Sequence, residues 1–494
     1  MKSTLRIMAL FLALLMLLPA IVACGKDDKG KEQNGGDQNA VTTDPNSGEY
    51  VSKLPAYDWE GDAFYILGQD GGAYNQFTNF EIWRENMDGT VVGDAVYTRN
   101  DALKKKYNFI VEAELVDNTY TESQTLYDAQ DDIYDLVIYN PMKVFNHAAS
   151  GYLTDLYGID YLDFDHPAWS SYINTQLTVG GKLYCTSNKF LLQDKARTYT
   201  MFYNRELARE YELGYLEDHV DNNTWTLEEF EKCCRLFSFD IDGGGAGGIG
   251  DSFGVVAESH ASYATLLYGA GFTLGTNDGE TITLTGATDA MNTIVTNTGK
   301  IWFDKNVTAV PEDFQPIDWA VSFNIFVEER APFFISFPSD FDAGKTGLNT
   351  KCNFEFGFMP FPKADSSQER YYNMMNYHNA SVFAVPYTVS DLPQVGFYLE
   401  ALSEESCDTS YTAYIDSKCK IQDSYDELTA KMLDLCFEST SYDVVACLDP
   451  GGIFTIICDQ IPNFRTNIFI RLYNSKGDKP QTELDEYVTM FQEQ

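Results

Sequence analysis

Between residues 60 and 140, short apolar runs alternate with segments in which apolar residues recur at helical spacing. The runs are predicted strands at 62–67, 109–114 and 134–139, and the spaced segments are predicted helices at 93–107 and 119–131. This alternation predicts an α/β fold with a mostly parallel sheet and helices on its faces. Ligands of such sheets bind beyond the carboxyl ends of the strands, which here lie near Gly68 and Asn140.

The next segment mixes β and helical patterns. A hairpin is predicted at 177–184 around Gly180-Gly181, and a strand at 198–203. A helix is predicted to begin at 225–230, because Thr226 and Glu229 have the spacing of a capping box. Trp225 at this helix start and Trp59 before the first strand are expected to be structural.

The N-terminus carries the longest uncharged stretch, which runs from Ile7 to Ala23 after Lys2 and Arg6. This pattern predicts a secretory signal peptide at 1–23. Ile-Val-Ala-Cys at 21–24 resembles a bacterial lipobox, which implies that Cys24 carries lipid on its sulfur and becomes the mature N-terminus. A plain signal peptide and an uncleaved membrane helix are the alternatives. Residues 24–53 are predicted to be a flexible tether, since their composition is mostly small and polar.

Composition sets the class of protein. The chain has 494 residues, of which 44% are apolar and 14% aromatic, enough for two or three domains or one large bilobal unit. Its formal net charge of −40 disfavours binding to nucleic acid and to anionic lipid. The charge also argues against an anionic substrate, although a local basic pocket could overrule it.

Cysteine and histidine patterns give little support for a metal site. Nine cysteines follow Cys24, none in a C-x-x-C pair, so buried free thiols are favoured over a disulfide among the cysteines of the last ninety residues. The five histidines form no H-x-x-x-H or H-E-x-x-H pattern, so no catalytic zinc site is predicted. No cofactor is expected.

The order of several short motifs resembles that of the extracellular solute-binding proteins of ABC importers, in the carbohydrate-binding branch that includes maltose-binding protein. The motifs include Tyr-Asp-Leu-Val at 134–137, Gly-Lys-Leu-Tyr at 181–184, Tyr-Asn-Arg-Glu-Leu at 203–207 and Phe-Gly-Phe-Met-Pro-Phe-Pro-Lys at 356–363. The resemblance implies two α/β lobes joined by a multi-strand hinge. Carried onto this chain, lobe I is 54–186 plus 380–428, and lobe II is 187–379 plus 429–494.

Aromatic residues are the main clue to the ligand. Sugar rings stack their C–H faces on flat aromatic side chains, while their hydroxyl groups need polar partners. For each single tryptophan a place in the core is the alternative. The candidate ligand-binding residues are Tyr74, Gln76, Trp83, Asn140, Trp169, Trp302, Trp319, Tyr377 and His378.

The glycine-rich segment 240–251 has a partial calcium-loop pattern. Asp240, Asp242, Gly245 and Asp251 stand at loop positions 1, 3, 6 and 12, but position 5 is Gly244, which offers no side-chain ligand. A flexible glycine loop without metal is therefore favoured over bound calcium, and no metal site is predicted.

The resemblance and the residues together predict a lipid-anchored, extracellular, monomeric binding protein that delivers a neutral sugar to a membrane permease. A surface glycan-binding or sensor protein of the same fold is the alternative. An enzyme is not expected, because no nucleophile motif is visible and 74 acidic residues make any carboxylate pair uninformative.

Overall fold

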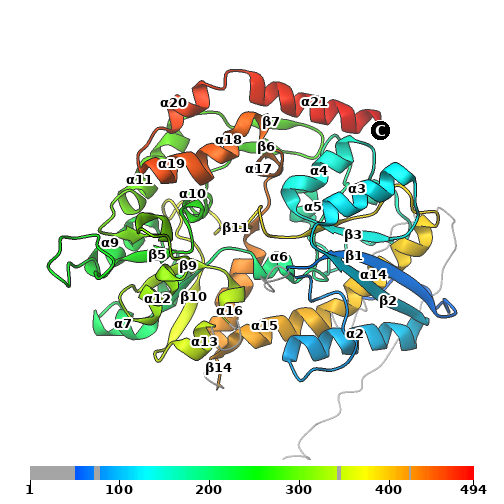
Figure 1. Ribbon diagram of the computed structural model, residues 1–494, viewed down its shortest axis with the longest axis horizontal. Helices are drawn as coiled ribbons and strands as arrows, with labels where there is room; N and C mark the ends of the chain where they lie inside the picture. Colours follow the sequence, from blue (N-terminus) through cyan, green and yellow to red (C-terminus); the bar gives the residue numbers. More distant parts are fainter. Residues whose placement is uncertain (1–49, 72–77, 342–346, 422–423) are drawn as a thin grey trace, which may run out of the picture. The chain divides into compact units, whose positions relative to one another are not determined.

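The computed structural model describes residues 50–71, 78–341, 347–421 and 424–494 (Figure 1). Its contacts divide the chain into Met1–Val51 and Ser52–Gln494, and every feature below belongs to the second unit. This unit contains two separate larger sheets, each with helices packed around it (Figure 1).

The first sheet has the strand order β12-β3-β1-β2. Strand β1 pairs in parallel with β2 and β3, while β12 runs antiparallel to β3, so the predicted parallel sheet is confirmed and gains one antiparallel edge strand. Strand β3 is buried along its whole length, as its uniformly apolar sequence requires of a central strand. The strands are β1 (Asp62–Gln69), β2 (Phe109–Val116), β3 (Leu136–Tyr139) and β12 (Val382–Ala384).

Capping residues fix the helices around this sheet. Thr90 begins α2 by accepting a hydrogen bond from the Gly93 amide at 3.2 Å, and Asn108 ends it in the left-handed conformation with φ 54°. Both predicted helices of this region are confirmed. The helices are α2 (Val91–Tyr107), α3 (Thr119–Ala129), α4 (Pro141–Ala149), α5 (Ser171–Leu177), α14 (Leu392–Ser406) and α15 (Thr412–Cys419).

The second sheet has the order β10-β4-β9-β5-β8. Strands β5, β8 and β9 are parallel to one another, and β4 runs antiparallel to both β9 and β10. Phenylalanines fill its interior, and Trp225 is buried beside them with its Nε1 donating to the Pro360 carbonyl at 2.9 Å, which confirms its structural role. The strands are β4 (Thr200–Asn204), β5 (Val255–Ala257), β8 (Thr308–Ala309), β9 (Phe333–Ser336) and β10 (Phe356–Met359).

Helices and two hairpins complete this second part of the fold. The helices are α6 (Gln193–Ala196), α7 (Arg205–Glu210), α8 (Glu217–Asp221), α9 (Leu227–Leu236), α10 (Tyr263–Gly269), α11 (Asp289–Trp302), α12 (Val321–Val327) and α13 (Leu348–Lys351). The hairpins pair β6 (Gly275–Asn277) with β7 (Ile282–Leu284), and β13 (Lys420–Ile421) with β14 (Ser424–Tyr425).

Two local predictions need correction. The hairpin predicted at 177–184 is reduced to one antiparallel bridge between Val179 and Lys182, because Ser170 caps helix α5, which extends to Leu177. Gly180 and Gly181 form its turn, at φ 59° and 79°. At α9, Thr226 does cap the helix, but the Glu229 carboxylate bonds Lys232 at 3.2 Å instead of completing the capping box.

The chain crosses between the two sheets in three segments. Thr186 and Phe383 exchange backbone hydrogen bonds of 3.1 and 2.9 Å, so the first two segments are paired with each other. Strand β11 (Asn373–Met374) pairs with β15 (Thr440–Ser441), which joins the second crossing to the third. The sheets are therefore linked by strands that are hydrogen-bonded to one another.

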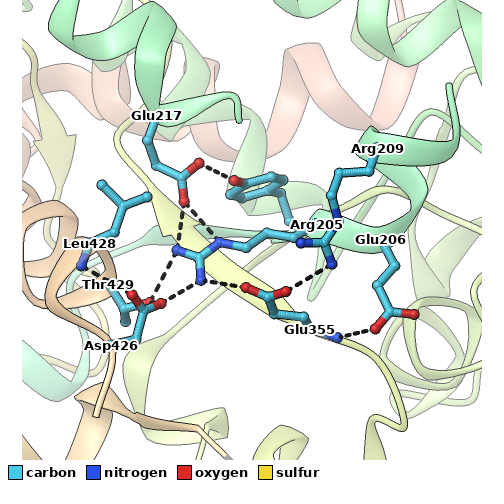
Figure 2. A network of polar contacts seen from close by, with 9 residues as sticks. Arg205, Glu206, Arg209, Glu217, Glu355, Asp426, Leu428 and Thr429 are labelled. Carbon is cyan, nitrogen blue, oxygen red and sulfur yellow. Dashed lines mark hydrogen bonds and ion pairs between the residues drawn. The ribbon is translucent and has the colours of Figure 1, made fainter. Parts of the chain in front are cut away.

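A buried arginine fixes the third crossing (Figure 2). Arg205 at the start of α7 pairs with Glu217 at 2.6 Å and with Asp426, which caps α16 (Glu427–Glu438). Glu355 adds a further contact at 3.3 Å from the same guanidinium, and Thr429 accepts another hydrogen bond at 3.3 Å. Each carboxylate of this Arg205 cluster thus has a cationic partner.

The C-terminal segment contacts the β6–β7 hairpin and the region around helix α4. Gln481 of the last helix bonds the backbone of Ile282 and Leu284 in β7, both at 3.0 Å. Phe491, near the other end of this helix, packs against Tyr184 and Phe145. The helices are α17 (Val444–Leu448), α18 (Ile453–Thr455), α19 (Ile461–Phe464), α20 (Phe469–Asn474) and α21 (Lys479–Glu493).

The cysteines whose side chains the structure describes are all free thiols. Seven of these eight are buried and only Cys407 is partly exposed. The prediction of buried free thiols is confirmed for these residues, and Cys24 lies outside the described part of the chain.

Candidate functional site

Polar residues gather where the strands of the first sheet end. Gln69 ends β1, Asp117 follows β2 and Asn140 follows β3, and these three residues line one cavity of about 350 Å³. The remaining wall of this cavity is the crossing segment 378–381 that leads into β12. The carboxyl edge of the sheet, where the sequence predicts ligand binding, is therefore hollow and polar.

Asn140 caps helix α4 and also lines the cavity. Its side-chain oxygen accepts a hydrogen bond from the Met142 amide at 2.9 Å and so caps α4, while its amide group donates to the carbonyl of His378. Both residues line the cavity, so two of the predicted ligand-binding residues lie together here.

A buried network of hydroxyl groups lies next to the cavity, centred on Tyr139, which lines it. The Tyr139 hydroxyl lies 2.6 Å from that of Tyr127 and 3.0 Å from that of Ser123, and it contacts His147 at 3.3 Å. Burial lowers the pKa of His147 to about 4, so this imidazole is neutral at pH 7. The network holds the end of β3 against α3 and α4.

The loop after β1 ties this cavity to the crossing segments. Asn79 accepts a hydrogen bond from the Gln69 amide at 2.7 Å and donates to Ser381 at 3.3 Å. Glu81 accepts from the backbone amide of Gln193 in α6 at 3.2 Å. Burial raises the pKa of Glu81 to about 7, although the hydrogen bonds it accepts oppose that shift.

The corresponding edge of the second sheet is acidic. Glu258 follows β5 and accepts hydrogen bonds from the Tyr199 hydroxyl at 2.9 Å and from Ser259 at 2.7 Å. Burial raises the pKa of Glu258 in spite of these donors. Asn376 donates to the Tyr199 hydroxyl at 3.4 Å, so the crossing segment 376–381 contacts polar groups at the carboxyl edges of both sheets.

A histidine bridge lies at the same edge of the second sheet. His260 bonds Glu312 through Nδ1 at 2.7 Å and Asp459 through Nε2 at 3.1 Å. The hydrogen bond to Glu312 is the main cause that raises the pKa of His260. Sequence reasoning did not select His260 or Glu258; the signal available was the apolar run 255–257 that ends directly in polar residues.

The other predicted site residues lie apart from this cavity. Trp169 is buried and donates to Glu400 at 2.9 Å, Tyr377 is buried and donates to the Ser441 carbonyl at 3.1 Å, and Trp302 is packed inside beside Tyr263. Trp83 and Trp319 are exposed on loops, at 42% and 64%. Tyr74, Gln76 and Cys24 lie outside the described residues, and ligand contact by any of these side chains stays a prediction.

The glycine-rich loop does bring its three aspartates together. Carboxylate oxygens of Asp240, Asp242 and Asp251 lie within 4.8 Å of one another. Backbone amides of the loop already donate to all three, at 2.7 to 3.1 Å. These hydrogen bonds use lone pairs that a calcium ion would need.

No family model matches the chain, and no curated protein matches its sequence. Its structure, however, resembles several solved structures. A cyclo/maltodextrin-binding protein complexed with maltotetraose aligns over 88% of this chain and 97% of its own, with TM-score 0.52 and 14% identity. UgpB from Mycobacterium tuberculosis in complex with glycerophosphocholine aligns over 87% and 100%, with TM-score 0.51 and 15% identity.

The chain has the fold of the ABC solute-binding proteins. An ABC substrate-binding protein from Listeria monocytogenes in complex with cycloalternan shares this solute-binding fold over 86% of the chain and 98% of its own, with TM-score 0.50 and 14% identity. The predicted α/β class with two lobes joined by a multi-strand hinge is thereby confirmed. Identities this low show the fold alone. Within the described residues, no helix has both the length and the apolar character to cross a membrane.

Proposed function

We propose that this chain is the extracellular solute-binding protein of an ABC importer and that it captures a neutral sugar or oligosaccharide between two lobes. The observation that carries the proposal is the crossing segment 376–381, which contacts polar groups at the carboxyl edges of both sheets. A ligand held there would contact both lobes at once, so binding would favour their closed arrangement.

The chemistry of these edges suits hydroxyl groups. Gln69, Asn140 and His378 combine donors with acceptors, and Asp117 and Glu258 supply carboxylate acceptors. Two of the solved structures of this fold contain sugars and a third contains glycerophosphocholine. These ligands share hydroxyl groups. We therefore propose that this site binds solutes that carry several hydroxyl groups.

Lobe I is proposed to be residues 54–186 plus 380–428 and lobe II residues 187–379 plus 429–494. The closed form would dock on a membrane permease, and lipid on Cys24 would hold the protein at the outer face of the membrane. We infer no catalysis, because the solved relatives of this fold are binding proteins.

Calorimetry of the purified chain against a panel of neutral mono- and oligosaccharides tests the site. Asn140→Asp keeps the helix cap but removes the amide donor, and His378→Ala removes a side chain that lines the cavity. We expect each to weaken binding about tenfold, the effect of one lost hydrogen bond. His219→Ala, in α8 and outside the cavity, is the matched control. Absence of binding across the panel, or unchanged affinity in both variants, would overturn the proposal.

Anchorage is tested separately with Cys24→Ala. We expect this variant to appear in the medium or to remain as an uncleaved precursor. Membrane-bound, lipid-labelled Cys24→Ala would contradict the anchor without affecting the binding proposal.

A further inference from the structure

Two further cavities meet at Tyr172, on α5. One has a volume of about 190 Å³ and the other about 260 Å³, and neither shares a lining residue with the cavity at the carboxyl edge of the first sheet. Because Tyr172 lines both cavities, we consider them together and call them the Tyr172 groove.

Aromatic rings line both parts of this groove. Trp169, Tyr411 and Phe437 line the smaller cavity, while Tyr268, Phe272 and Tyr372 line the larger one. Polar side chains stand among them, including Asn188 in the first part and Gln176 in the second. Trp169, Phe437, Tyr268 and Phe272 are buried behind the walls, whereas Tyr172, Tyr372 and Tyr411 are partly exposed. These three tyrosine rings, with polar groups near them, offer faces on which sugar rings can stack.

Cations border the groove, although the chain as a whole is strongly acidic. The Arg370 guanidinium lies 4.7 Å from the ring centre of Tyr172 and 4.8 Å from that of Tyr372, and Lys189 lies 5.2 Å from the ring of Tyr411. Among the described residues, neither Arg370 nor Lys189 forms an ion pair with a carboxylate. Their charges are therefore available to a ligand.

Two carboxylates also line the groove and limit what can bind. The Asp443 carboxylate already accepts two hydrogen bonds within the protein, from the Tyr268 hydroxyl at 2.8 Å and from the Val445 amide at 2.9 Å. Glu438 is exposed and lines the smaller cavity, which Lys189 also lines. A ligand anion is thus expected at Arg370, beside Tyr172 and Tyr372, while Lys189 offsets the charge of Glu438 in the smaller cavity.

We propose that the Tyr172 groove is a second binding site, which takes a carboxylated oligosaccharide. Uronic acid rings have a C–H face to stack on the tyrosines and a planar carboxylate. Arg370 contacts the rings of Tyr172 and Tyr372, and a guanidinium can bind a planar carboxylate through two hydrogen bonds. This site is separate from the proposed neutral-sugar site and does not depend on it.

The test uses α-1,4-linked trigalacturonate and its fully methyl-esterified form, which has the same sugar backbone but carries neutral methyl esters in place of the carboxylates. We expect calorimetry to show binding of the acid and at least about tenfold weaker binding of the ester. Arg370→Met should weaken binding of the acid about tenfold, because it loses one charge-assisted contact, and Lys189→Met should weaken it because the charge of Glu438 is no longer offset.

Lys232→Met, which removes an exposed cation from α9, is the matched control and should bind the acid like the wild type. Thermal unfolding checks that the variants are folded, and the two groove variants report independently. Equal affinity for acid and ester, unchanged affinity in both groove variants, or loss of acid binding only in His378→Ala would each overturn the proposal.

Discussion

The Arg205 cluster and the region around Glu81 each contain a buried carboxylate next to a crossing segment. They differ in whether that carboxylate has a cationic partner. Arg205 gives Glu217 and Asp426 direct charged partners (Figure 2). Around Glu81 the nearest arginine, Arg99, donates to the backbone carbonyls of Glu81 and Ile82 at 2.7 and 2.9 Å. Among the described residues, the second carboxylate oxygen of Glu81 accepts no hydrogen bond.

The two sites therefore respond differently to pH: the charge of Arg205 is constant, whereas the charge of Glu81 changes. A guanidinium stays charged at every ordinary pH, so the Arg205 cluster holds α16 in place throughout. Glu81 instead changes its charge near neutral pH, and through Asn79 and Gln193 it contacts both the candidate site and α6. Three predictions follow from the comparison, in order of expected size.

Arg205→Met should destabilise the protein by about 3 to 5 kcal/mol, because it leaves buried carboxylates without their cation. Arg209→Met is the matched control, since Arg209 is 41% exposed and pairs with Glu355, which is itself 39% exposed. Its cost should stay below about 1 kcal/mol. Urea denaturation measures both, and similar losses in the two variants would show that the cluster is not the main support of the third crossing.

Glu81→Gln should remove part of the pH dependence of stability. The folded pKa of about 7 lies above the ordinary value of 4.5, so the folded state retains a proton that the unfolded state loses. Wild-type stability should therefore fall as pH rises from about 4.5 to 7, by about 3 kcal/mol from this group. The variant should lack this decline. Glu228→Gln, an exposed residue of α9, is the control and should keep the wild-type slope.

His260→Gln should give the smallest effect, about 1 kcal/mol at pH 6. Because its partners raise the folded pKa of His260, its contribution is complete below about pH 6.5 and is lost as pH rises through the folded pKa. The stabilities of the variant and the wild type should converge once the pH lies above the folded pKa of His260. A difference of stability that grows with pH would mean that the imidazole is not held as a cation between Glu312 and Asp459.

The sequence predicted best where one local pattern decides the structure. Strands β1, β2 and β3 are apolar runs, and α2 and α3 have clear caps, so the first sheet followed from periodicity. The antiparallel partner β12 comes from residues 382–384, and no local signal shows that pairing across more than 240 residues. The hairpin predicted at 177–184 is limited to a single bridge, Val179 with Lys182, because the helix capped by Ser170 extends to Leu177.

The candidate site was predictable in part for the same reason. Asn140 ends a central strand, which places it at the carboxyl edge of the sheet, and His378 precedes the strand beside it. Tyr199 bonds Glu258 across 59 residues and Asp459 bonds His260 across 199 residues, so no spacing in the sequence links them. Ligand contact by the tryptophans stays a prediction; Trp302 and Trp169 are both buried, and Trp169 donates a hydrogen bond to Glu400.

The buried thiols have a consequence for handling the molecule in air. Burial raises the pKa of Cys233, Cys352 and Cys458 to about 12, so these side chains carry almost no reactive thiolate while the chain is folded. Unfolding would expose all of them together and permit random cross-linking by oxidation. Refolding should consequently be complete with a reductant present and incomplete after denaturation under oxygen.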